Sequence, residues 1–172
     1  MMKAKAKIDA YRQEWAQTHN GAKTSFGNTL VAFGVPIEES IKWRETLINP
    51  ADYLEYDQKL VETMKILSEN FKIAAVTNNP LKPAKKTLDV LGVSDFFSCI
   101  VALDTCCVSK PHKAPYECAA KSLDVPFEKC LSVGDRYDID LAVPLSMGMG
   151  AILVSGVKDV YELPVILKKA QP

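Results

Sequence analysis

KCLSVGDRYDIDLAV, the sequence from Lys129 to Val143, carries the plainest indication of the fold. Its apolar start, Cys130–Val133, is bounded by Gly134 and predicts a buried strand. Three carboxylates follow, and the apolar residues after them suit a helix. Open α/β sheets bind ligands where parallel strands give way to helices, so the pattern indicates a ligand site. The alternative is an Asp-rich helix start, with the acids as N-cap and first-turn partners of the helix dipole.

The three carboxylates belong to Asp135, Asp138 and Asp140. Carboxylate oxygens are hard ligands, which suit Mg²⁺ and phosphate chemistry rather than a soft metal. The five cysteines are odd in number and show no C-x-x-C spacing. That usage argues against a zinc site and for reduced thiols, as in the cytoplasm.

Composition narrows the possible partners. The 172 residues are enough for one domain with a real core, with or without a small addition. Basic and acidic residues both number 21, so no net charge favours nucleic acid or an anionic membrane surface. No apolar run approaches the roughly 20 residues of a membrane span, and no apolar core follows the N-terminal charges, so we expect no signal peptide. We therefore predict a cytoplasmic protein without nucleic-acid or membrane partners.

Residues 1–52 show helical spacing of apolar side chains, which predicts a small all-helical segment. Its third helix is expected to start at Pro36 and to end at Asn49 and Pro50. The candidate buried positions of that helix are Ile37, Ile41, Trp43 and Leu47. We interpret the aromatic residues of this segment as core rather than as ligand contacts.

Residues 53–172 alternate between short apolar runs and helical patterns. The predicted strands are Lys72–Val76, Cys99–Leu103, Cys130–Val133 and Ala151–Val154, and the predicted helices include Asp57–Asn70, Pro83–Leu91 and His112–Leu123. Such alternation is typical of βαβ units with a parallel sheet and right-handed crossovers. The predicted fold class is therefore α/β.

Polar residues follow the first two predicted strands. Thr77-Asn78-Asn79-Pro80 comes after KIAAV, where a hydroxyl, amides and free backbone N–H groups can hold an anion. A simple capping turn uses the same residues, and both interpretations stay open. After the second strand, Lys110 in Ser109-Lys110-Pro111 can supply a fixed positive charge to a phosphate, although a solvated lysine is more common for that tripeptide alone.

This ordered set resembles the haloacid dehalogenase (HAD) superfamily of phosphatases and related hydrolases, from roughly residue 53 onward. The resemblance implies a Rossmann-like, three-layer parallel sheet. It makes residues 1–52 similar to the small helical cap that shapes the substrate pocket in many of these enzymes. It also implies Mg²⁺-dependent hydrolysis of a small phosphorylated substrate through an aspartyl-phosphate.

The resemblance assigns a role to each matched residue. VTNN resembles the second motif, so Thr77 and Asn78 would bind phosphate, and Lys110 would neutralise charge during catalysis as in the third motif. GDRYDID resembles the fourth motif, so Asp135 and Asp140 would hold Mg²⁺. Asp138 is an additional acid, which we interpret as a helix N-cap.

The family's first motif, D-x-D-x-T, is missing from the 172 residues, whose one D-x-D is Asp138-Ile-Asp140. The first Asp of that motif is the nucleophile and the second is the acid/base. Ser25-Phe26-Gly27-Asn28-Thr29-Leu30 resembles it with Ser and Gly at the acid positions, but no buried strand leads in, so we interpret it as coincidence. We expect a truncated, inactive form; the alternative is a catalytically silent domain for phosphate or metal binding, or for interaction.

In the family, the missing strand lies at the centre of the sheet, between Lys72–Val76 and Cys130–Val133. Its loss would leave backbone groups unpaired, at about 1–3 kcal/mol for each one that is buried. We expect the chain to close the sheet, to rearrange its N-terminus, or to cover the opening with a partner chain, including by self-association.

Overall fold

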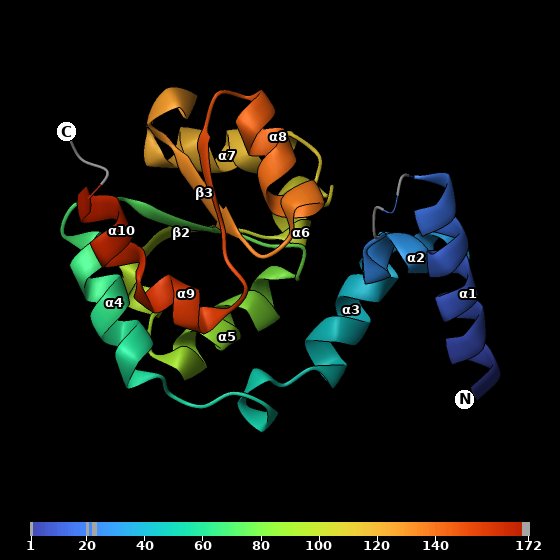
Figure 1. The fold of residues 1–172 in the computed structure, drawn as a ribbon. Coiled ribbons are helices and arrows are strands. Elements are labelled where there is room, and N and C mark those ends of the chain that lie inside the picture. The colour runs from blue at the N-terminus through green and yellow to red at the C-terminus, as the bar shows by residue number, and fades with distance from the viewer. Residues whose placement is uncertain (1, 20, 22–23, 170–172) are drawn as a thin grey trace.

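The computed structural model describes residues 2–19, 21 and 24–169 (Figure 1). Met1 and residues 170–172, at the outer ends of the two predicted segments, lie outside the described residues. The N-terminal elements are α1 (Met2–Thr18), α2 (Phe26–Ala32), α3 (Ile37–Leu47) and the 3₁₀ turn Pro50–Asp52. The first sheet region comprises α4 (Gln58–Ser68), β1 (Ile73–Val76), α5 (Leu81–Leu91), β2 (Phe97–Val101), α6 (Leu103–Cys106) and α7 (Ala114–Leu123). The second comprises β3 (Leu131–Gly134), the π-helical turn Tyr137–Leu141, α8 (Ala142–Ser146), β4 (Gly150–Leu153), α9 (Val157–Tyr161) and α10 (Leu163–Lys169).

The N-terminal segment is helical, as the apolar spacing predicts, and it lies to one side of the sheets (Figure 1). Its burial is not as predicted: in α3, Trp43 is 41% exposed and Leu47 is 79% exposed. Phe33 is also largely exposed, although its ring contacts Tyr11 at a centroid distance of 5.5 Å. Three short helices enclose too little volume to bury every apolar side chain. The division near residue 52 stays a prediction.

The α/β fold class is confirmed, with parallel strands and helices on both faces (Figure 1). β1 pairs with β2, and β3 pairs with β4, both in parallel. The second predicted strand was placed two residues late, because pairing ends at Val101 and Leu103 already begins α6. The Thr105 hydroxyl accepts a hydrogen bond from the Ala102 N–H at 3.0 Å, which turns the chain out of the sheet at that point.

The four strands form two separate two-stranded sheets, and within the described residues no ladder joins β1 to β3. The break lies at the place expected for the missing strand, and neither sheet closure nor the N-terminal helices fill it. Leu131 and Val133 of β3 are 41% and 39% exposed. The prediction that this strand is buried is therefore wrong, because among the described residues β3 pairs with β4 alone and its other edge faces the break. Self-association over the opening stays a prediction.

Two apolar clusters bridge the break, one on each face. On one face, Met64 and Leu67 of α4 pack with Leu163 of α10, together with side chains from β1 and β4. On the other face, Tyr116 and Ala120 of α7 pack with apolar residues from β1 and from the segment around α8. Packing of these helices thus fixes the position of one two-stranded sheet relative to the other.

One polar contact reinforces this bridge between α4 and α9. The Tyr161 hydroxyl donates to the Asp57 carboxylate at 2.6 Å, and the same carboxylate caps α4 at the Leu60 N–H.

Within the described part of the chain, no helix is both long and apolar enough to cross a bilayer.

Candidate functional site

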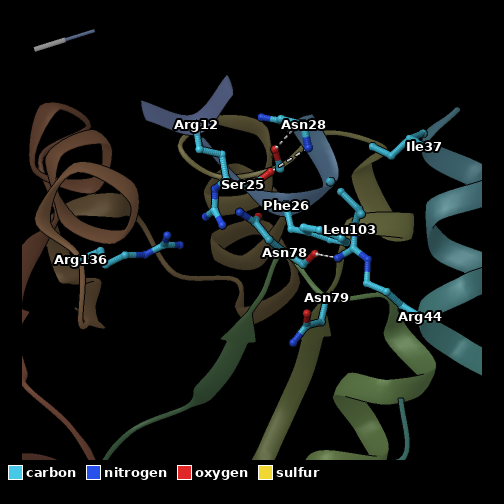
Figure 2. Close-up of a pocket in the computed structure, with 12 residues that line it drawn as sticks. Arg12, Ser25, Phe26, Asn28, Ile37, Arg44, Asn78, Asn79, Leu103 and Arg136 are labelled. Atoms are coloured by element: carbon cyan, nitrogen blue, oxygen red, sulfur yellow. Dashed lines mark hydrogen bonds between the residues drawn. The ribbon is translucent and has the colours of Figure 1, made fainter. Parts of the chain in front are cut away.

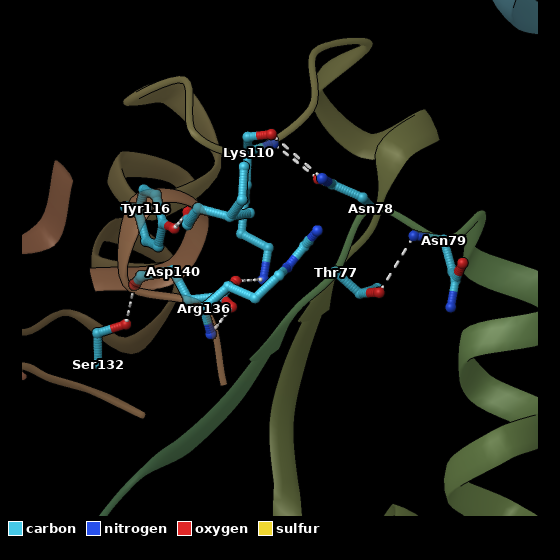
Figure 3. Close-up of polar contacts among 9 residues, drawn as sticks. Thr77, Asn78, Asn79, Lys110, Tyr116, Ser132, Arg136 and Asp140 are labelled. Atoms are coloured by element: carbon cyan, nitrogen blue, oxygen red, sulfur yellow. Dashed lines mark hydrogen bonds and ion pairs between the residues drawn. The ribbon is translucent and has the colours of Figure 1, made fainter. Parts of the chain in front are cut away.

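Three loops meet at the carboxyl ends of the strands (Figure 3). The loop after β1 carries Thr77 and Asn78, the loop before α7 carries Lys110, and the loop after β3 carries Arg136 and Asp140. Parallel strands direct their carboxyl ends to the same side, so segments far apart in sequence converge there. The structure therefore brings together four of the five residues named from the sequence.

Asn78 joins the first two loops. Its side-chain oxygen accepts the Lys110 N–H at 2.7 Å, and its side-chain nitrogen donates to the Lys110 carbonyl at 3.2 Å. This pair of bonds fixes the Lys110 backbone against the end of β1. Asn78 thus positions the lysine, in addition to the phosphate contact expected from the sequence.

Lys110 and Asp140 form a largely buried ion pair. The lysine Nζ lies 2.7 Å from Oδ1 of Asp140, and the two side chains are 15% and 8% exposed. Lys110 is therefore held by an ion pair and is not a solvated surface lysine, whereas its contact with a phosphate stays a prediction. The other carboxylate oxygen of Asp140 accepts the Arg136 N–H at 3.1 Å.

The loop that presents Asp140 is tightly constrained. A Cβ added at Gly134 would lie 2.3 Å from the Asp140 Cβ, so only glycine fits there without movement. The Ser132 hydroxyl donates to the Asp140 carbonyl at 2.8 Å, and the buried Tyr116 hydroxyl donates to the Ile139 carbonyl at 2.8 Å. Burial, and next the nearby Asp140 charge, raise the pKa of Tyr116, so its hydroxyl remains a donor.

The loop after β1 forms a hydrogen-bonded turn, but none of its side chains caps α5, whose N-cap is Pro80. The Thr77 hydroxyl accepts the Asn79 N–H at 3.1 Å, and the Leu81 N–H at the start of α5 donates to the Asp104 carboxylate at 2.9 Å. Two backbone donors of the expected anion cradle are therefore engaged. The Thr77 hydroxyl keeps its own proton for donation, because a hydroxyl both accepts and donates.

The remaining acids of the GDRYDID loop are exposed. Asp135, the fifth residue named from the sequence, lies at the surface, in the same loop as Asp140. We call Lys110, Asp140 and Asn78 the Lys110–Asp140 cluster. Asp138 lies inside the π-helical turn, whose N-cap is Arg136, so its interpretation as an N-cap is wrong. The turn starts two residues earlier than expected because the Asp140 N–H already bonds to the Arg136 carbonyl at 2.8 Å.

The oxygen ligands around Asp140 are of the type that binds Mg²⁺, but they are few in number. Asp140 accepts one hydrogen bond at each carboxylate oxygen, whereas a carboxylate offers about four lone-pair positions. Asp135 adds a second, exposed carboxylate, and Mg²⁺ is commonly held by one or two carboxylates together with water and substrate phosphate. Among the described residues, no three metal-ligating side chains form a cluster.

A cavity of ≈ 170 Å³ lies between the N-terminal helices and this cluster (Figure 2). Its walls come from α1, the start of α2, α3, and the loops after β1 and β3. The lining residues are Arg12, Ser25, Phe26, Gly27, Asn28, Ile37, Arg44, Asn78, Asn79, Leu103, Ser109 and Arg136. Phe26 therefore borders a cavity, against the expectation that the aromatic residues of this segment serve only as core.

Sequence reasoning did not identify the cationic lining of this cavity. Arg12 and Arg44 lie on helices whose sequence pattern gives no sign of a site, so only the tertiary structure reveals them. Arg136 stands inside GDRYDID, and its position between two acids was the available signal. Ser25 is the N-cap of α2 and not a strand end, although Asn28 beside it accepts a hydrogen bond from the Ser109 hydroxyl at 3.2 Å.

Comparisons with known proteins agree on one family for this chain. A family model described as haloacid dehalogenase-like hydrolase matches residues 4–148. A phosphoglycolate phosphatase of Colwellia psychrerythraea is 32% identical over 87 residues, which cover 51% of this chain and 38% of that protein. The 5-amino-6-(5-phospho-D-ribitylamino)uracil phosphatase YigB of Escherichia coli is 29% identical over 110 residues, which cover 64% of this chain and 41% of that protein. The chain thus spans less than half the length of these relatives.

Solved structures show the same fold. The HAD phosphatase of Thermococcus onnurineus superposes with a TM-score of 0.60 at 22% identity, covering 83% of this chain and 70% of that one. The HAD-hydrolase YfnB of Bacillus subtilis, whose crystal contains magnesium, gives a TM-score of 0.61 at 15% identity, covering 96% of this chain and 83% of that one.

Proposed function

The chain belongs to the haloacid dehalogenase-like hydrolase family, and on that premise we propose that it is the phosphate-holding part of a phosphatase for small phosphate esters. The observation that carries the proposal is the buried ion pair between Lys110 and Asp140, held by Asn78 at the carboxyl ends of the strands. Relatives named as phosphatases support the reaction class.

In this proposal, Lys110 neutralises the negative charge of the bound phosphoryl group, because a fixed cation in a largely buried site interacts strongly with it. Thr77 donates its hydroxyl proton to a phosphate oxygen. Asn78 keeps a second amide N–H for the same purpose after bonding to the Lys110 backbone. Asp135 and Asp140 would hold Mg²⁺, which when bound supplies positive charge against the phosphoryl oxygens.

The carboxylate nucleophile has no candidate in these 172 residues, which contain no D-x-D outside the fourth motif. Such a carboxylate would bond to phosphorus while the ester P–O bond breaks and an acid protonates the leaving oxygen; water would then release phosphate from the aspartyl-phosphate. We therefore expect the 172-residue chain to hydrolyse p-nitrophenyl phosphate no faster than buffer.

The test is calorimetric titration with inorganic phosphate in the presence of Mg²⁺. Lys110→Gln removes the charge but keeps an amide that can bond to Asp140, so the fold should survive, as circular dichroism would check. We expect its phosphate affinity to fall about tenfold or more, the effect of losing one charge-assisted hydrogen bond. Lys113→Gln, at an exposed lysine three residues along, is the matched control. Equal affinity of wild type and Lys110→Gln would overturn the proposed phosphate site.

A second candidate is a catalytically silent domain that binds phosphate or metal. It is favoured by the fact that, in the described part of the chain, Asp140 supplies the one carboxylate paired with Lys110. The genomic sequence upstream of Met1, translated in frame, separates the two. An apolar strand ending in D-x-D-x-T would favour hydrolysis, and a stop codon or unrelated sequence would favour binding alone.

A further inference from the structure

The cavity beside Lys110 is lined by three guanidinium groups that approach it from different elements (Figure 2). Arg12 comes from α1, Arg44 from α3, and Arg136 from the loop after β3. Within the described residues, none of the three forms an ion pair with a carboxylate. Amide and hydroxyl groups of Ser25, Asn28 and other polar residues also line the cavity, and Phe26, Ile37 and Leu103 form its apolar part, so the charged groups of the lining are all cationic.

Arg44 is the most constrained of the three. Its Nη1 donates to the Asn78 carbonyl at 3.0 Å and its Nη2 to the Ser40 hydroxyl at 2.9 Å. Its Nε is buried and has no hydrogen-bond partner in the described part of the chain. Partial burial lowers the pKa of Arg44, yet a guanidinium stays charged in proteins. A half-buried cation without a counter-charge is stabilised by any anion that enters the cavity.

The cavity and the proposed phosphate site share a wall. Asn78 bonds to Lys110 through its side chain and to Arg44 through its backbone carbonyl. Figure 3 shows the Arg136 side chain extending from the Asp140 loop toward Thr77 and Asn78. A small molecule bound at Lys110 therefore has the arginines directly beyond it.

We infer that this cavity binds a second anionic group of the substrate, a carboxylate or a second phosphate carried by the same small ester. The inference rests on the proposed function and names its substrate class as phosphate esters with at least two acidic groups. The cavity volume of ≈ 170 Å³ compares with the roughly 150 Å³ cavity that holds one benzene molecule. The group beyond the phosphate must therefore be small.

The experiment measures the binding of matched esters by calorimetry at low ionic strength. Ethyl phosphate has one acidic group, and phosphoglycolate has the same chain length with a carboxylate at its end. Two homologues with one and two further methylene groups test the reach between Lys110 and the arginines. Propane-1,3-diol bisphosphate tests a second phosphate in place of the carboxylate.

We expect at least one doubly acidic ester to bind about ten- to a hundredfold more tightly than ethyl phosphate, as for charge-assisted hydrogen bonds. Arg44→Gln and Arg136→Gln should each remove most of that gain, measured as the ratio of the affinities for the doubly acidic ester and for ethyl phosphate in the same variant. Lys42→Gln, an exposed lysine on the same helix as Arg44, is the control and should keep the gain. A gain for the bisphosphate alone would identify the second group as phosphate.

The two proposals fail in different ways. If inorganic phosphate and all the esters leave the protein unbound, the proposed function falls, and the inference with it. If ethyl phosphate binds and the doubly acidic esters bind no more tightly, the inference alone is overturned. A gain that survives both arginine substitutions also overturns it, because the second acidic group would then bind elsewhere.

Discussion

The Lys110–Asp140 cluster and the arginine-lined cavity lie side by side, but they differ in whether their charges have partners of opposite sign. In the cluster, each charge has a fixed partner: Lys110 bonds to Asp140, and Asp140 also accepts the Arg136 N–H. In the cavity, three guanidinium groups have no carboxylate partner among the described residues. The cluster therefore stabilises the fold without a ligand, whereas the cavity gains stability when an anion enters.

The largest effect should follow from breaking the cluster. Asp140→Ala leaves the Lys110 ammonium largely buried and unpaired, and should lower the free energy of unfolding by about 3 kcal/mol in urea denaturation. Asp135→Ala, at an exposed acid of the same loop, is the control and should change it by less than about 0.5 kcal/mol. Similar losses in both variants would show that the ion pair contributes little.

A much smaller effect should follow in the cavity. Arg44→Met removes a desolvated charge that lacks a counter-charge, together with its bonds to Asn78 and Ser40. Because these changes oppose each other, we expect the free energy of unfolding to change by less than about 1 kcal/mol. A loss comparable to that of Asp140→Ala would mean that the cavity is as self-sufficient as the cluster, and would remove the contrast between them.

Asp57 is a partly buried charge with a fixed partner, and it adds a third case to the contrast between the cluster and the cavity. The Tyr161 hydrogen bond, and next the Leu60 N–H, lower the pKa of Asp57. A carboxyl whose pKa is lower in the folded state stabilises the protein above its unfolded pKa, about 3.9, and loses that contribution as the pH falls through the folded value. Asp57→Asn should therefore cost less than about 1 kcal/mol near pH 7, and the difference from wild type should shrink below about pH 4.

That measurement is thermal unfolding of both proteins across the acidic range. A constant difference between wild type and Asp57→Asn at all pH values would contradict the charge-based explanation. It would instead assign the whole effect to helix capping by the side-chain oxygen, which an asparagine also provides.

Much of the fold could be predicted from local pattern. The apolar runs before VTNN and GDRYDID mark β1 and β3 to within a residue, because strands and the polar loops after them are local features. Lys110 and Asp140 could be placed together because the carboxyl ends of parallel strands converge. The exposure of Leu131 and Val133 could not be read from their apolar character, because burial depends on a neighbouring strand that this sheet lacks.

The cavity was beyond sequence reasoning for a physical reason. Arg12 and Arg44 are ordinary polar positions of amphipathic helices, and nothing within one helix shows what the helix faces. Their convergence on Asn78 depends on how the N-terminal helices sit against the loop after β1. Burial of Trp43 and Leu47 was wrong for the related reason that helical periodicity identifies a face but not what covers it.

The break between β1 and β3 has a consequence for cooperativity. In a continuous sheet, each strand is tied to the next by a hydrogen-bond ladder, so that loss of one strand weakens all the others. Here each half is a βαβ unit with its own ladder, and side-chain packing of α4, α7 and α10 is what couples the halves. Because each apolar cluster contains residues from both halves, opening one half would expose apolar surface on the other, so the cooperativity of the α/β region comes from helix packing rather than from a shared ladder.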